Sequence, residues 1–170
     1  EIAFTAFDNK DVSGPWSYTV PATPGPHADV STTIESRALM ANVLYDLPNI
    51  GTGRFSAQPF LSAGIGMAWN KMGDWTRTNA ASSRPSRTFE GDTNTDLAWT
   101  LGAGVSWNVG KNSSGPIKLD LMYQYFDLGS AQGGSTLLSG GGSSTPVSPL
   151  EFDVSSQVIS VGVRIPLNLR

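Results

Sequence analysis

Apolar and polar side chains alternate along most of this chain, and the longest example runs from residue 97 to residue 109. Because successive side chains of a β-strand point to opposite faces, a period of two predicts a strand. No segment carries apolar residues at the i, i+3, i+4 spacing of a helix over any length, so the pattern predicts an all-β chain. One face of this longest strand is wholly apolar: Leu97, Trp99, Leu101, Ala103, Val105, Trp107 and Val109.

Six segments share the alternation, and we predict that they form an antiparallel, up-and-down sheet in a single domain spanning residues 1–170. The predicted strands are 1–8, 31–47, 58–70, 96–109, 116–128 and 152–167. Short turns follow the second and fourth strands. Long segments rich in Gly, Pro, Ser or Thr follow the others, and we expect these to be loops: 9–30, 73–95 and 130–150.

The polarity of the two faces predicts the surroundings of the sheet. Opposite each apolar face stand small or weakly polar side chains, among them the glycines at 64, 66, 102 and 104, rather than the charged residues of a soluble surface. Apolar residues facing out and small or polar residues facing in are typical of a transmembrane β-barrel. A soluble, lipocalin-type barrel would instead turn its tryptophans inward. The residues expected to face lipid are Leu39, Val43, Leu61, Ile65, Leu101, Val105, Leu121, Val161 and Val163.

Aromatic residues lie near both ends of the predicted strands. Trp69, Trp99 and Tyr125 are near the long loops, and Tyr45 and Trp107 are near the short turns. Two such rings form the aromatic girdles of a barrel at the two membrane interfaces. Ordinary cross-strand aromatic packing is the alternative. With the short turns on the periplasmic side, the long loops are predicted to be extracellular.

Four charged residues fall on the predicted inward faces: Asp46, Lys118, Asp120 and Arg164. Charges inside a narrow barrel need partners, because an isolated ion is costly to desolvate. We expect Arg164 to pair with one or more acids, and Asp120 is the first candidate because the last two strands are neighbours. Two interpretations stay open, namely a salt-bridge network that fills the lumen and a selective pore lined by the same groups.

Composition excludes several kinds of chemistry. The 170 residues include no Cys and one His, which leaves no thiolate chemistry and no pair of soft metal ligands. His27 lies in a Pro-rich segment that offers no rigid catalytic platform, and we expect neither an enzyme nor a metal or cofactor. The net charge of −3 and the absence of a basic run disfavour nucleic acid. No run of about 18 apolar residues exists for a transmembrane helix.

Four segments together resemble a known family. They read ALMANVLYDL, QPFLSAGIGMAW, LAWTLGAGVSWNV and LDLMYQYFDLG, and they resemble the small outer-membrane β-barrels of the OmpA-type and bacterial surface-antigen superfamily. The YQYFDLG segment, 123–129, is similar to the end of the family's seventh strand. The resemblance implies eight strands and a bacterial outer-membrane location. One departure is the last strand, where Ile165 and Leu167 stand in place of the aromatic residues of the family's assembly signal.

Only six strands can be counted, whereas the resemblance implies eight. The chain starts at Glu1 without a signal peptide, so we expect it to begin after processing or partway along a longer protein. We expect a hairpin of two further strands to precede Glu1 in the native protein, or to be supplied by another chain. It would pair with 2–7 on one side and with 158–165 on the other. The function that we expect is a structural or surface-interaction barrel, in contact with outer-membrane lipid and with proteins through its extracellular loops. A passive pore is the alternative, and a membrane hydrolase is a third.

Overall fold

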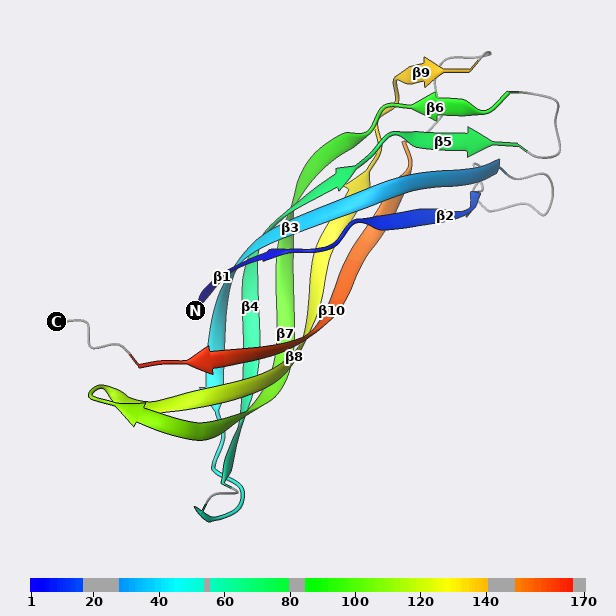
Figure 1. The fold of residues 1–170 in the computed structure, drawn as a ribbon. Coiled ribbons are helices and arrows are strands. Elements are labelled where there is room, and N and C mark those ends of the chain that lie inside the picture. The colour runs from blue at the N-terminus through cyan, green and yellow to red at the C-terminus, as the bar shows by residue number, and fades with distance from the viewer. Residues whose placement is uncertain (17–27, 54–55, 80–84, 141–148, 167–170) are drawn as a thin grey trace.

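The computed structural model describes residues 1–16, 28–53, 56–79, 85–140 and 149–166, and all of its strands belong to one sheet (Figure 1). The described part is all-β, as predicted, and contains no helix and therefore none long and apolar enough to cross a membrane. The strands are β1 (Ile2–Ala6), β2 (Lys10–Trp16), β3 (Ala28–Asp46), β4 (Ala57–Met72), β5 (Trp75–Thr78), β6 (Arg87–Phe89), β7 (Asp92–Asn112), β8 (Gly115–Gln132), β9 (Leu137–Ser139) and β10 (Glu151–Arg164).

Five long strands form the antiparallel body of the sheet, in the order β10-β8-β7-β4-β3. On the far side of β3, β1 pairs with residues 37–41 and β2 with residues 28–34. These two strands therefore form one edge strand that is interrupted at 7–9. In the described residues this edge does not pair with β10, so the sheet is curled but open (Figure 1).

The first predicted loop, 9–30, is wrong in part, because Lys10–Trp16 and the first residues of β3 are paired strands. Gly14 and Pro15 made this segment read as a loop. Proline cannot donate to a ladder, but an edge strand has one side without a partner and tolerates it. The rest of the predicted loop, including His27, lies outside the described residues.

The other two predicted loops are also partly strand. β5, β6 and β9 lie within or at the ends of 73–95 and 130–150, and β7 and β8 extend into the same ranges. β5 pairs with the start of β3, β6 with β5, and β9 with β6. We call these three short strands the distal lobe, which Figure 1 shows at one end of the sheet. At the other end, which we call the turn end, are the two short connections after β3 and β7.

The distal lobe has an apolar core of its own. Trp75 is fully buried, its ring stacks on Phe89 at 4.3 Å between centroids, and its Nε1 donates to the Gly134 carbonyl at 3.0 Å. Burial of these side chains explains why segments that look like polar loops are ordered as strands. The buried members of this cluster are Val30, Ile34, Met72, Trp75, Phe89, Ala131 and Leu150.

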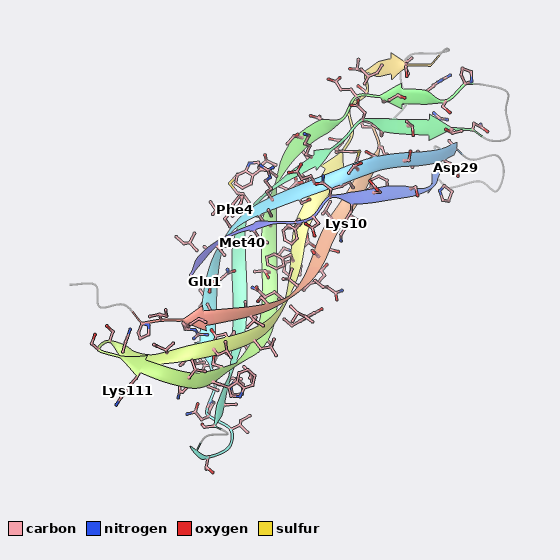
Figure 2. The ribbon with its side chains drawn as sticks, viewed as in Figure 1. Glu1, Phe4, Lys10, Asp29, Met40 and Lys111 are labelled. Carbon is pink, nitrogen blue, oxygen red and sulfur yellow. The ribbon has the colours of Figure 1, made fainter. Side chains whose placement is uncertain are left out.

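The two faces of the body differ as the alternation predicts. On one face, which we call the outer face, the large apolar side chains are exposed. The opposite, inner face buries small and polar residues, so the tryptophans Trp69 and Trp99 point outward. Figure 2 shows side chains on both faces, with Asp29 at the lobe end and Lys111 at the turn end. All residues expected to face lipid are exposed except Val105, which is half-buried.

Inner-face glycines make room for larger side chains of neighbouring strands. A Cβ on Gly104 would collide with the ring of Phe60, and one on Gly64 would collide with the Asn42 side chain. By contrast, a Cβ on Gly162 in β10 would meet no atom within 4 Å. The glycines of β4 and β7 are therefore required by packing across the inner face.

We expect Gly104→Ala to lower the free energy of unfolding by about 1–3 kcal/mol, because overpacking displaces Phe60 or the backbone. Urea titration of both variants measures this. Gly162→Ala is the matched control and should change stability little. Equal effects of the two substitutions would contradict the packing role of Gly104.

Candidate functional site

The four charged residues predicted to face inward meet in the structure. Asp46 ends β3, Lys118 and Asp120 lie two residues apart on β8, and Arg164 ends β10. The strand periodicity puts Lys118 and Asp120 on the same face, and the register sets Arg164 opposite Lys118. These four residues, which we call the charge cluster, therefore gather at the turn end of the inner face.

Arg164 is the centre of the charge cluster. Its Nε and Nη2 lie 3.0 and 2.9 Å from Asp120 Oδ2, and its Nη1 donates to Asp46 Oδ1 at 3.2 Å. The guanidinium also lies over the Phe60 ring, at 5.1 Å from the centroid. The expected contact between Arg164 and Asp120 is present, and Asp46 is the second acid that Arg164 contacts.

Lys118 completes the cluster. Its Nζ donates to Asp46 Oδ2 at 3.1 Å and to Gln58 Oε1 at 2.7 Å. Ser106 Oγ donates to Asp120 Oδ1 at 2.5 Å. Two cations and two carboxylates thus neutralise one another. Gln58 of β4 accepts a further hydrogen bond from Lys118, and Ser106 of β7 donates one to Asp120. Gln58, Phe60 and Ser106 were not singled out in the sequence, although each lies on the inner-face alternation of its strand.

The Arg164–Asp46 contact crosses the inner face. β10 and β3 stand at opposite ends of the path β10-β8-β7-β4-β3 and do not pair with each other. Their side chains meet only because the sheet curls, and Lys118 of β8 reaches Asp46 in the same way. The cluster therefore ties distant strands together across the concave side, and its side chains occupy the space at the turn end.

We expect Arg164→Ala to lower the free energy of unfolding by about 1–3 kcal/mol, because two carboxylates lose their shared partner. The value is below that of a fully buried pair, since the four side chains are 15–34% exposed and water screens them. Chemical unfolding of each variant measures the change. Arg37→Ala is the control, because the exposed Arg37–Glu35 pair should contribute at most about 0.5 kcal/mol. An Arg164 effect no larger than this control would contradict the role of the cluster.

A second polar group lies deeper in the inner face and was missed. Asn70 is fully buried; its Nδ2 donates to the carbonyls of Leu128 and Ser130, and its Oδ1 accepts from Ser36 Oγ at 2.7 Å. Asn94 Nδ2 also donates to the Ser130 carbonyl, at 2.6 Å. These side chains donate hydrogen bonds to β8 carbonyls beyond Asp127, where backbone pairing of β7 with β8 ends. An isolated Asn in an alternating strand gives no sign of such a role.

The aromatic residues proposed as girdles all lie on the outer face. Tyr45, Trp69 and Trp99 are exposed, and Tyr125 and Trp107 are half-buried. The rings of Trp99 and Tyr125 also contact each other, at 5.5 Å between centroids. This pair therefore makes the cross-strand contact, which does not conflict with the predicted position at a membrane interface.

The chemistry available to the described residues is limited. No three His, Cys, Asp or Glu side chains gather there in an arrangement that could hold a metal ion. In the charge cluster, both carboxylates are already bound by cations, and neither His nor Cys is present. This arrangement is suited to holding strands together and filling space.

Comparison with known proteins gives few relatives. Uncharacterized proteins of Brucella abortus, Brucella suis and Brucella melitensis are each 31% identical over 86 residues. The match covers 51% of this chain, and the chain spans only 28% of the length of these relatives. No family model matches the chain, and no solved structure matches it. The chain is therefore similar to one part of these uncharacterized Brucella proteins, which are longer than the chain.

Proposed function

We propose that this chain is the membrane-spanning part of a bacterial outer-membrane β-barrel that presents its distal lobe at the cell surface. One observation carries the proposal: the exposed outer face is apolar over five strands, whereas the inner face buries polar side chains. Examples of the buried polar residues are Asn42, Ser62, Thr100, Ser106 and Gln124. Soluble proteins rarely expose so large a contiguous apolar surface, but a barrel in lipid requires it.

The apolar surface also has the edge expected of a membrane band on its lobe side. Leu39, Met67 and Leu97 are aligned across β3, β4 and β7, and all three are exposed. Beyond this row, the outer face is polar on β3 and β7, and on β4 Trp69 precedes Lys71. A band that ends at the same level on neighbouring strands matches a slab of hydrocarbon better than it matches scattered surface apolar residues.

Two further strands are part of the proposal. The free edges at β1–β2 and β10 would leave unpaired N–H and C=O groups, which hydrocarbon does not tolerate. A segment of the same protein outside residues 1–170, or another chain, would pair with both edges and close the barrel. With β1–β2 counted as one strand beside the five long strands, eight strands then surround the lumen, the number implied by the family resemblance.

A structural and surface-interaction role fits this arrangement better than a pore. The charge cluster neutralises itself and occupies the turn end of the inner face, which counts against an open aqueous channel. The distal lobe is ordered by its own core, so it offers a fixed surface to protein partners outside the cell. Reconstituted protein is expected to show no single-channel conductance, and a stable conductance would favour the passive pore.

Cysteine labelling tests location and orientation. The chain has no Cys, so single cysteines can be placed at Leu138 in β9 and at Ser113 in the turn after β7. A membrane-impermeant maleimide added to intact cells is expected to label Leu138→Cys but not Ser113→Cys. Both should be labelled after the outer membrane is opened. Labelling of Ser113→Cys alone would invert the orientation, and labelling of both in intact cells would contradict the spanning role.

A further inference from the structure

A groove of about 210 Å³ lies on the outer face, just beyond the apolar band on its lobe side. We call it the headgroup groove. β3 supplies two of its side chains, β4 supplies two, and β7 supplies one. The five residues are Glu35, Arg37, Trp69, Lys71 and Thr93.

The strand register explains why these side chains gather. Arg37 stands opposite Trp69, Glu35 stands opposite Lys71, and Lys71 stands opposite Thr93. All lie on the same face, because each is an even number of positions from the apolar residues of its strand. The groove therefore begins one row beyond Leu39, Met67 and Leu97, where the outer face changes from apolar to polar.

The groove carries an excess of positive charge. Arg37 is 58% exposed, and its Nε and Nη2 donate to one oxygen of Glu35 at 3.0 and 2.6 Å. This contact orients the guanidinium, and Nη1 donates no hydrogen bond within the described part of the chain. Lys71 has no ion-pair partner among the residues that the structure describes. One carboxylate thus faces two cations.

An oriented guanidinium and a flexible ammonium together suit a phosphate. Guanidinium N–H groups match the spacing of phosphate oxygens, and an ammonium adds a mobile point charge. Trp69 beside them has the amphipathic ring that prefers the level of lipid headgroups. The apolar row next to the groove would receive acyl chains of the same molecule, which favours a lipid over free phosphate.

We infer that the headgroup groove binds the phosphate of a lipid headgroup in the outer leaflet, with Arg37 and Lys71 as ligands and the acyl chains along Leu39, Met67 and Leu97. This inference rests on the proposed membrane function. It assigns the outer face a lipid-selective site in addition to its general apolar contact. The competing arrangement is a surface ion network in which Glu35 holds both cations and no lipid is selected.

Native mass spectrometry of the full chain in detergent micelles, titrated with bisphosphorylated lipid A, tests the site. The unaltered protein is expected to retain one lipid. The double variant Arg37→Gln/Lys71→Gln should bind about 30-fold more weakly, because each basic residue near a lipid headgroup contributes about five-fold in affinity. Lys10→Gln/Lys111→Gln is the matched control, since it removes the same charge elsewhere and should leave binding unchanged. Equal weakening by both double variants would overturn the site.

Two further arms exclude the alternatives. Glu35→Gln removes the competing negative charge and is expected to tighten lipid binding about five-fold; loss of binding would indicate an ion network organised by Glu35 and overturn the inference. Dephosphorylated lipid A and inorganic phosphate alone should each bind far more weakly than the phosphorylated lipid. Inorganic phosphate binding as tightly as the lipid would make this an anion site and not a lipid site.

The outcome also separates this inference from the proposed function. Insertion of each variant into phosphatidylcholine vesicles is measured in parallel, by protection of the spanning strands from protease. If the unaltered protein does not insert, the membrane function fails. If it inserts and binds phosphorylated and dephosphorylated lipid equally, only the headgroup site fails.

Discussion

Leu101→Arg is expected to lower the free energy of unfolding in lipid vesicles by about 2–4 kcal/mol, the cost of a cation at the midplane of a barrel's lipid face. Leu101 lies in the middle of β7, is 55% exposed, and stands opposite Ala63 and Tyr125 on the outer face. Because more than half of its surface is exposed, its replacement removes less packing than that of a buried leucine would. The cost therefore comes from the surroundings of the sheet and not from its interior.

Thr95→Arg is the control for this prediction. Thr95 is on the same face of the same strand, but beyond the row of Leu39, Met67 and Leu97, where an arginine reaches water. Its effect should be within about 0.5 kcal/mol, as for most exposed positions. In a soluble protein both substitutions would be equally mild, because an exposed arginine is easily hydrated. Equal effects would therefore contradict the membrane-spanning role. Urea titrations of both variants in the same vesicles give the comparison.

Trp75→Ala is expected to unfold the distal lobe, with a local loss of about 3–5 kcal/mol, the usual cost of removing a buried tryptophan from a core. Trp75 is fully buried, stacks on Phe89 and donates to the Gly134 carbonyl. These two contacts join β5 to β6 and to the segment between β8 and β9. Its loss should free β5, β6 and β9 while the body of the sheet remains folded.

Limited trypsin digestion measures this local effect. Arg77 and Arg87 lie in β5 and β6, and cleavage near them should become fast in Trp75→Ala. Leu138→Ala is the matched control, because Leu138 is in the lobe but 53% exposed, and it should leave the digestion pattern unchanged. An unaltered digestion pattern in Trp75→Ala would mean that the lobe does not depend on this core.

Sequence periodicity predicted the body of the sheet because side-chain direction follows directly from residue parity. Once residues 97–109 are a strand, Trp99 and Thr100 must face opposite ways. The distal lobe could not be found in this way. β6 and β9 have three residues each, too few to show a period. The hydrogen-bond acceptor of Trp75 is 59 positions away in the sequence, so the residues next to Trp75 do not predict that it is buried.

The charge cluster was also predictable only in part. Arg164 and Asp120 lie on neighbouring strands, so their contact followed from order and parity alone. The contact of Arg164 with Asp46 needed the curvature of the sheet, which no residue pattern specifies. Gln58 and Ser106 were overlooked because neutral polar residues on an inner face look like spacers until a charged partner is placed beside them.

The contact between Arg164 and Asp46 has a consequence for the order of assembly. The two residues are 118 positions apart and are joined only through the sequence of strands between them. Closing so long a separation is entropically costly, so we expect this contact to form late in folding. A late contact contributes little to the rate of folding and much to the slowness of unfolding. We therefore expect the pair to slow the unfolding of the completed sheet and to have little effect on the rate at which the sheet folds.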